Sequence, residues 1–143
     1  EAISLYPKLG IHAVNVAPEF GVAETRAFLS LLSEHKLNKH KEQFIKIAYN
    51  SKKWEKWMLP GTKADDIQKA VIAGHYVFSH PECIEMKKEI QRQLTAKNID
   101  VEEYLKTAVK QSILRYLRCF RLLRFYERSR VNHYQPQPAR SHR

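Results

Sequence analysis

The sequence predicts a mainly α-helical chain that opens with one αβα slice of an α/β protein. Residues 11–18 form a short apolar run with β-branched side chains, which is typical of a buried strand. From residue 24 to about residue 123, apolar side chains recur at helical spacing instead. A strand that is apolar on both faces needs neighbouring strands and helices to cover it, and no second convincing strand follows. We therefore expect its partners to come from outside this chain, which would make the sequence a fragment.

The first elements follow from local signals. Residues 2–9 predict the end of a helix, and Pro18 with Gly21 brackets a sharp turn after the strand. Glu24 opens the next helix, because an acid suits a helix N-terminus. We therefore expect residues 1–36 to form a helix, a strand, a tight loop and a helix.

The rest of the chain predicts further helices and a polar tail. The expected helices are residues 39–49, a short helix capped by Ser51 that carries Trp54, Trp57 and Met58, one from Asp65 or Asp66 to about Phe78, one starting at Ser79-His80-Pro81-Glu82 and ending near Asn98, and one capped by Asp100 with an apolar stripe to Leu117. The predicted organisation is a β/α unit in residues 1–36, a helical extension in residues 37–123 and a basic, disordered tail in residues 124–143.

Composition and charge limit the classes of protein. The 143 residues suit one ordinary domain, and no apolar run reaches the roughly 20 residues that a membrane helix needs. The net charge of +10 is uneven, because residues 115–143 hold eight Arg and one acid while the body is nearly balanced. Cys83 and Cys119 lack a partner at zinc-finger spacing and are expected to be reduced core residues. With no signal-peptide pattern at the start, this favours a cytoplasmic protein.

The order of four elements resembles the non-catalytic subunit of class II tagatose-bisphosphate aldolases, a (β/α)8 barrel (TIM barrel) with a helical C-terminal extension. The matching runs are Ile11-His12-Ala13-Val14-Asn15-Val16-Ala17-Pro18 with Glu24-Thr25-Arg26-Ala27-Phe28, Lys53-Trp54-Glu55-Lys56-Trp57, His75-Tyr76-Val77-Phe78-Ser79-His80-Pro81, and Ile113-Leu114-Arg115-Tyr116-Leu117-Arg118. The resemblance covers roughly residues 2–120. It implies a C-terminal fragment of the barrel, with one strand and the last barrel helix, followed by the helical extension. Glu19 has no clear counterpart in the family, and the tail after Leu123 matches nothing.

The resemblance also implies partners and a function. The family supports a catalytic aldolase subunit in carbohydrate metabolism, so the expected partners are that subunit or a second copy of the chain, together with a sugar phosphate. Related barrels are thought to be sugar epimerases, which leaves open a sugar or sugar-phosphate epimerase or aldolase fragment. Zinc in class II aldolases comes from earlier strands. This piece therefore supplies no metal or cofactor site, and a divalent metal would belong to the full protein or its partner.

Site residues are expected where a barrel strand ends, because active sites of this fold lie at the C-terminal ends of the strands. By that logic Asn15, Glu19 and Phe20 lie at the rim. Glu19 is the catalytic candidate, as general base, hydroxyl binder or metal ligand. Asn15 and Gly21 are candidates for substrate binding, together with the amides of Val22 and Ala23, which would face a phosphate. The alternative is that Pro18 to Gly21 only turns the chain and that Glu19 is solvated.

Other chemistry-bearing residues have structural interpretations. His12 is expected to pack, His75 and His80 lack the spacing of helical zinc ligands, and Trp54 and Trp57 suit a packing clamp better than a sugar-stacking platform. The remaining motif is a basic amphipathic stripe, formed by Arg115, Arg118, Arg121, Arg124 and Arg128. It would suit a phosphate backbone or an anionic membrane, but a nearly neutral body favours a packed terminal helix. We therefore expect no membrane partner and argue against a nucleic acid.

Overall fold

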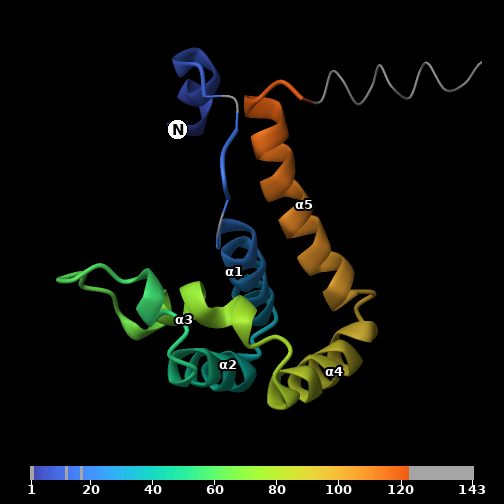
Figure 1. Ribbon diagram of the computed structural model, residues 1–143. Coiled ribbons are helices and arrows are strands. Elements are labelled where there is room, and N and C mark those ends of the chain that lie inside the picture. The colour runs from blue at the N-terminus through green and yellow to red at the C-terminus, as the bar shows by residue number, and fades with distance from the viewer. Residues whose placement is uncertain (1, 12, 17, 123–143) are drawn as a thin grey trace, which may run out of the picture. The chain divides into compact units, whose positions relative to one another are not determined.

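The structure, a computed structural model, describes residues 2–11, 13–16 and 18–122 (Figure 1). These residues are mainly helical and contain no strand. The α-helices are α1 (Glu19–Glu34), α2 (Asn38–Asn50), α3 (Asp66–Ala73), α4 (Pro81–Thr95) and α5 (Val101–Cys119), and the 3-10 helices are η1 (Ala2–Leu9), η2 (Glu55–Trp57) and η3 (Gly74–Tyr76). The chain divides into one compact unit of residues 15–113 and another of residues 1–14 with 114–143.

We expected a strand over residues 11–18. The described residues of this segment form no strand and adopt no regular structure. Ile11 and Val14 are exposed, at 37% and 36%. A strand must pair its backbone groups with a neighbour, and no other described segment is a strand. His12 and Ala17 lie outside the described residues.

The first helix of the larger unit begins earlier than the sequence predicted. We expected it to open at Glu24, but α1 starts at Glu19, directly after Pro18. The amide of Val22 donates to the carbonyl of Pro18 at 2.8 Å, which is the first helical hydrogen bond. The turn expected over residues 18–21 is therefore the first turn of α1.

Three phenylalanine rings lie at the centre of the larger unit. Phe28 of α1 lies edge-on to Phe44 of α2, with centroids 4.9 Å apart, and to Phe78, at 5.4 Å. Phe44 stacks on Phe78 at 5.4 Å. Phe28 and Phe44 are at most 1% exposed, and such aromatic pairs stabilise beyond the area they bury. The rings tie α1 and α2 to the segment that follows η3.

Small residues let the backbones of this unit approach one another. Ala48 of α2 and Ala70 and Ala73 of α3 are fully buried. Gly74 is also buried, and a Cβ placed there would collide with the side chain of Thr25. The closest backbone approaches in the described residues are accordingly among α1, α2, α3 and η3.

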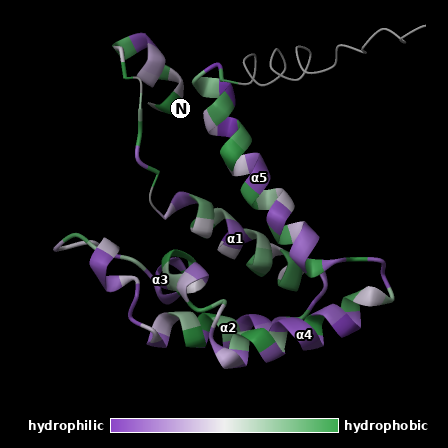
Figure 2. Cartoon of the chain, turned by 45° about the vertical axis from the view of Figure 1, so that its right-hand side comes forward, coloured by the Kyte–Doolittle hydropathy of each residue, from purple (hydrophilic) through white to green (hydrophobic). Residues whose placement is uncertain are grey.

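Helices α4 and α5 join the same core, mostly through side chains larger than alanine and glycine. The buried members are Cys83, Met86, Ile90 and Leu94 of α4, and Val101 and Leu105 of α5. Figure 2 shows hydrophobic and hydrophilic residues alternating along these helices, as in amphipathic helices. Gln91 clamps the α4–α5 connection, because its amide donates to the carbonyl of Ile99 at 3.0 Å and accepts from the amide of Val101 at 2.8 Å.

Several helix boundaries match the sequence prediction. Asp65 caps α3 in a capping box with Gln68, Pro81 occupies the first turn of α4, and the Asp100 carboxylate accepts from the amide of Glu103 at 3.0 Å. The short helix expected from Ser51 is only the 3-10 turn η2. The two aspartate caps satisfy backbone amides that the helix starts would leave without a partner.

The smaller unit contains η1 and the end of α5. The chain leaves η1 through Gly10, whose φ of +75° a glycine adopts without strain. After Cys119, Arg121 takes a φ of +58°, and the amide of Leu122 donates to the carbonyl of Leu117 at 2.9 Å. This arrangement ends the helix, so the arginine stripe does not continue along α5 past Cys119. Arg124, Arg128 and the predicted tail of residues 124–143 lie outside the described residues.

Candidate functional site

The sequence-predicted site residues lie at the start of the larger unit. Asn15 is exposed in the irregular segment before α1, whereas Glu19, Gly21, Val22 and Ala23 share the first turns of that helix. The structure therefore brings Glu19 and Gly21 together on one helix end. The amide of Val22 is already bonded to the Pro18 carbonyl. The Val22 amide is therefore used by the helix itself and does not face an anion, contrary to the sequence prediction.

Gly21 lies against His75 of η3. A Cβ at Gly21 would come within 2.6 Å of the imidazole Cδ2, so only glycine lets the ring approach the helix this closely. The Nδ1 atom of His75 is buried and has no hydrogen-bond partner among the described residues. Burial and the nearby charge of Lys56 lower the pKa of His75 from its usual 6.5. At neutral pH the imidazole is therefore in its uncharged form, and the same environment disfavours its protonation.

A group of aromatic and basic side chains surrounds Tyr76, the residue after His75. The two rings lie 3.9 Å apart, and the Trp57 indole donates to the Tyr76 hydroxyl at 3.3 Å. The Lys56 ammonium lies 4.4 Å from the centre of the Tyr76 ring and 5.2 Å from that of Trp57. Burial raises the pKa of Tyr76, but hydrogen bonds to Lys56 and Trp57 and the charges of Lys56 and Lys53 outweigh it, so the pKa is lowered.

The two tryptophans of the Lys-Trp-Glu-Lys-Trp run have different roles. Trp54 stacks on Tyr49 at 5.7 Å and donates to its carbonyl at 2.9 Å, while Lys69 lies 4.9 Å from the centre of the indole. Trp54 therefore packs against the helical body, and a clamp against a barrel stays a prediction. Trp57 bonds to Tyr76 through its indole nitrogen but remains 38% exposed, so part of its ring surface faces solvent.

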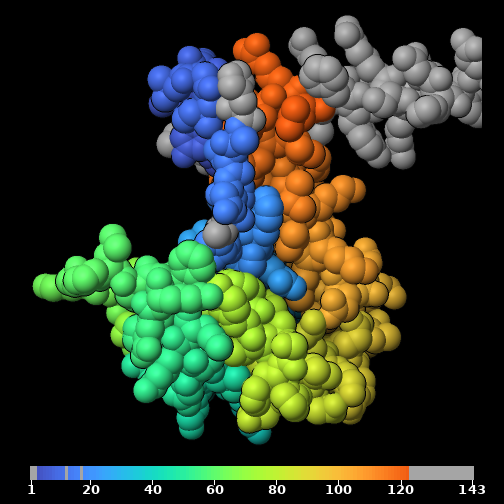
Figure 3. All heavy atoms as spheres, viewed as in Figure 1, coloured from blue at the N-terminus to red at the C-terminus, as the bar shows by residue number. Residues whose placement is uncertain are grey.

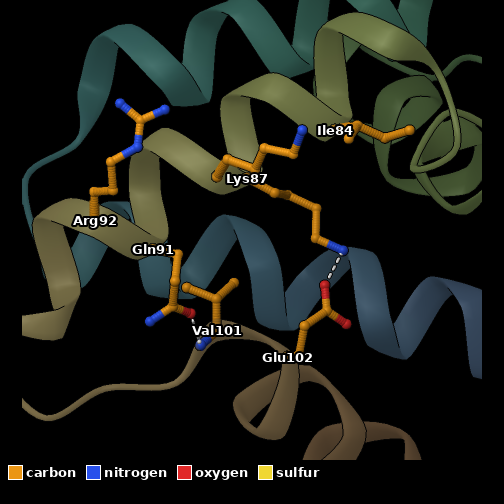
Figure 4. Close-up of a pocket in the computed structure, with 7 residues that line it drawn as sticks. Ile84, Lys87, Gln91, Arg92, Val101 and Glu102 are labelled. Atoms are coloured by element: carbon orange, nitrogen blue, oxygen red, sulfur yellow. Dashed lines mark hydrogen bonds and ion pairs between the residues drawn. The ribbon is translucent and has the colours of Figure 1, made fainter.

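An open groove of about 570 Å³ lies between α4 and the start of α5 (Figure 4). The residues that line it are Ile84, Lys87, Lys88, Gln91, Arg92, Val101 and Glu102. Its polar groups already have partners within the chain. Lys88 pairs with Glu85 at 2.7 Å, and Arg92 pairs with Glu89 at 2.8 Å. A groove of this size suits a small ligand, but its charges are balanced locally.

Lys87 is the most enclosed cation of this groove. Its ammonium pairs with the Glu102 carboxylate, as Figure 4 shows, and lies 5.4 Å from the centre of the Phe78 ring. Burial raises the pKa of the neighbouring Glu24, an effect that the charge of Lys87 opposes and that of Glu102 reinforces. The three side chains thus link α1, α4 and α5 electrostatically.

The histidines, cysteines and acidic residues that the structure describes do not gather into a metal site. Within the described ranges, no group of three or more His, Cys, Asp or Glu is arranged to hold a metal ion. Burial raises the pKa of the Cys83 thiol to about 11, so this cysteine is a poor nucleophile at neutral pH. Among the helices that the structure describes, none combines the length and the apolar character needed to cross a membrane.

Sequence reasoning missed the grouping of η3 with α1. The sequence prediction treated His75 as unsuited to zinc and did not place it against Gly21. The sequence predicted that Gly21 is a turn and substrate-binding residue, whereas in the structure it is the position at which the His75 ring approaches α1.

Comparison with known proteins finds no match for this chain. No family model matches the chain, and neither a curated protein nor a solved structure matches it. The function is therefore argued from the residues and their geometry.

Proposed function

We propose that the chain is the C-terminal part of a non-catalytic subunit of the class II tagatose-bisphosphate aldolase family, acting in cytoplasmic carbohydrate metabolism. Its residues 1–36 would belong to the last unit of a (β/α)8 barrel, and its helices would form the extension that packs on that barrel. The role is structural: the chain supports a catalytic subunit that cleaves ketose bisphosphates. A divalent metal would be held by that subunit or by the rest of the barrel.

One observation carries the proposal. The helical body has its own core around Phe28 and Phe44, yet Ile11 and Val14 of the preceding segment are exposed. Exposed β-branched residues in a strand-like run are what a segment lacking its neighbouring strands would show. The order of the four sequence elements supports the family, and the packing of Trp54 against Tyr49 supports a structural use of the tryptophan element.

The test mixes the chain with the catalytic subunit of a class II tagatose-bisphosphate aldolase. We expect a complex on size-exclusion chromatography and a longer half-life of aldolase activity on warming, measured as release of dihydroxyacetone phosphate. No complex and no change in half-life would reject the proposal.

The second candidate is a sugar or sugar-phosphate epimerase or aldolase in which Glu19 contributes to catalysis. The observation that favours it is the position of Glu19 in the first turn of α1, whose Gly21 packs on the uncharged His75. Glu19→Gln keeps the helix and removes the carboxylate. Loss of turnover on sugar phosphates, with the circular dichroism spectrum unchanged, would select the enzyme over the scaffold.

A further inference from the structure

Residues 57–63, here the docking loop, start at the last residue of η2 and form most of the connection to α3. Figures 1 and 3 show it extending away from the neighbouring helices. Its sequence begins with the apolar run Trp57-Met58-Leu59-Pro60. Leu59 is 76% exposed, the highest value among the large exposed hydrophobic residues of the described chain, and Trp57 is 38% exposed. Exposed apolar side chains that gather on one surface mark an interaction site.

The docking loop has one contact to the helical body and one hydrogen-bonded turn of its own. On one side, the indole of Trp57 bonds to the Tyr76 hydroxyl at 3.3 Å. On the other, the amide of Thr62 donates to the carbonyl of Leu59 at 3.0 Å across Pro60-Gly61. Gly61 has a φ of +82°, so this is a type II turn, with proline and glycine at the positions that favour them. A preorganised loop loses little conformational entropy when it binds.

Basic residues surround the apolar run. Lys52, Lys53, Lys56 and Lys63 are exposed, and Glu55 is the single acid between residues 51 and 64. An apolar centre with aromatic and methionine side chains and a charged rim has the anatomy of a protein–protein interface. The complementary surface is an apolar pocket rimmed by acidic residues. The narrow apolar tip, with one turn and one strongly exposed leucine, favours a protein pocket over a lipid surface.

We propose that the docking loop inserts Leu59 and the exposed part of Trp57 into an acid-rimmed apolar pocket on the partner subunit. This inference rests on the proposed function, which supplies the partner: the catalytic aldolase subunit. Leu59 enters the pocket, Trp57 covers its edge, and the lysines face its acidic rim. Electrostatic complementarity of this kind speeds association, whereas the buried anchor slows dissociation.

The test measures binding of the intact chain to the catalytic subunit by biolayer interferometry. Leu59→Asp should weaken affinity by more than about tenfold, mainly through faster dissociation. Leu9→Asp is the matched control, since Leu9 of η1 is 71% exposed. Lys63→Glu should slow association and reduce its salt dependence, while Lys110→Glu on α5 should not. Gly61→Ala should also weaken binding, because its methyl meets no atom within 4 Å but strains the turn.

The outcomes separate the inference from the function. If the wild-type chain binds and Leu59→Asp binds equally well, the docking loop is not the contact and the inference is wrong, while the proposed function stands. If the wild-type chain does not bind the catalytic subunit at all, both fail. Flotation with phosphatidylserine vesicles gives the third outcome. Flotation of the wild-type chain that Leu59→Asp abolishes would assign the loop to a lipid surface and overturn docking to a protein.

Discussion

Replacing Gly74 with alanine should destabilise the chain through crowding. Gly74 lies in the helical region, with φ of −56° and ψ of −43°, so its backbone suits any residue. The added Cβ would lie 2.7 Å from Oγ1 of Thr25 and 3.1 Å from Cζ of Phe44. Thr25 is held by its hydrogen bond to the Gly21 carbonyl at 2.9 Å, and Phe44 is held between two other rings. Neither neighbour can yield cheaply.

The size of the effect follows from two opposing contributions. Alanine lowers the conformational entropy of the unfolded chain, which stabilises the fold by about 0.4–1 kcal/mol. Overpacking a buried site costs about 1–3 kcal/mol. Since the neighbours of Gly74 are themselves fixed, we expect crowding to dominate. The free energy of unfolding should then fall by roughly 1–2 kcal/mol.

Urea unfolding followed by far-UV circular dichroism measures this change. Gly74→Ala should lower the midpoint without changing the slope with denaturant. Thr25→Ala removes two of the crowding atoms, so the double variant should lose on the order of 1 kcal/mol less than the sum of the single losses. A Gly74→Ala protein as stable as the wild type, or strictly additive losses, would refute the reasoning.

Three further predictions concern a cap, a carboxyl group and a thiol. Asp65→Ala should lower the free energy of unfolding by about 1 kcal/mol, because it removes the capping box with Gln68; urea unfolding measures this. Glu24 has a pKa raised above 4.5 by burial, so the folded state holds its proton more tightly than the unfolded state. Stability relative to Glu24→Gln should therefore fall as the pH rises from about 4.5 through the raised pKa, in a series of unfolding curves. Cys83 is 1% exposed with a pKa of about 11, so Ellman's reagent should modify it only after unfolding, whereas the less buried Cys119 reacts in the native protein.

Each of these has a control. Asp66→Ala removes an exposed acid beside the cap, whose pair with Lys69 at 3.5 Å is worth little; equal losses for Asp65 and Asp66 would contradict the capping argument. A difference between wild type and Glu24→Gln that stays constant with pH would mean that this carboxyl titrates alike in both states. Fast modification of a Cys119→Ser protein would show that Cys83 is accessible.

Much of the helical part was predictable because its start signals are local. Asp65, Pro81 and Asp100 act within a few residues of themselves, and each marks a helix start in the structure. The ends were harder. Lys36, Lys52 and Asn98 have positive φ just after helices, a conformation that glycine usually marks in a sequence. Without a glycine, the sequence predicted that α4 ends near Asn98, whereas it ends at Thr95.

The strand and the site depended on distant partners. Ile11 and Val14 have strand-forming side chains, but a strand exists only with a neighbour, which no local pattern supplies. The sequence predicted that Glu19 and Gly21 lie in a turn after the strand. The structure places them in the first turn of α1. The approach of His75 to Gly21 joins residues far apart in sequence, and spacing alone did not indicate it. Whether Glu19 and Asn15 bind a substrate stays a prediction.

The close packing of α1, α2, α3 and η3 has a consequence for how the larger unit opens. These elements approach through Ala48, Ala70, Ala73 and Gly74, whereas α4 and α5 reach the same core mostly through larger side chains. Close backbones shield amide groups, and native-state hydrogen exchange resolves such units as foldons. The unit should therefore open in two steps, with α4 and α5 exchanging first and the helices around Phe28 and Phe44 exchanging only on global unfolding. The docking loop lies shortly before α3 in the sequence, so it would be attached to the part of the unit that unfolds last.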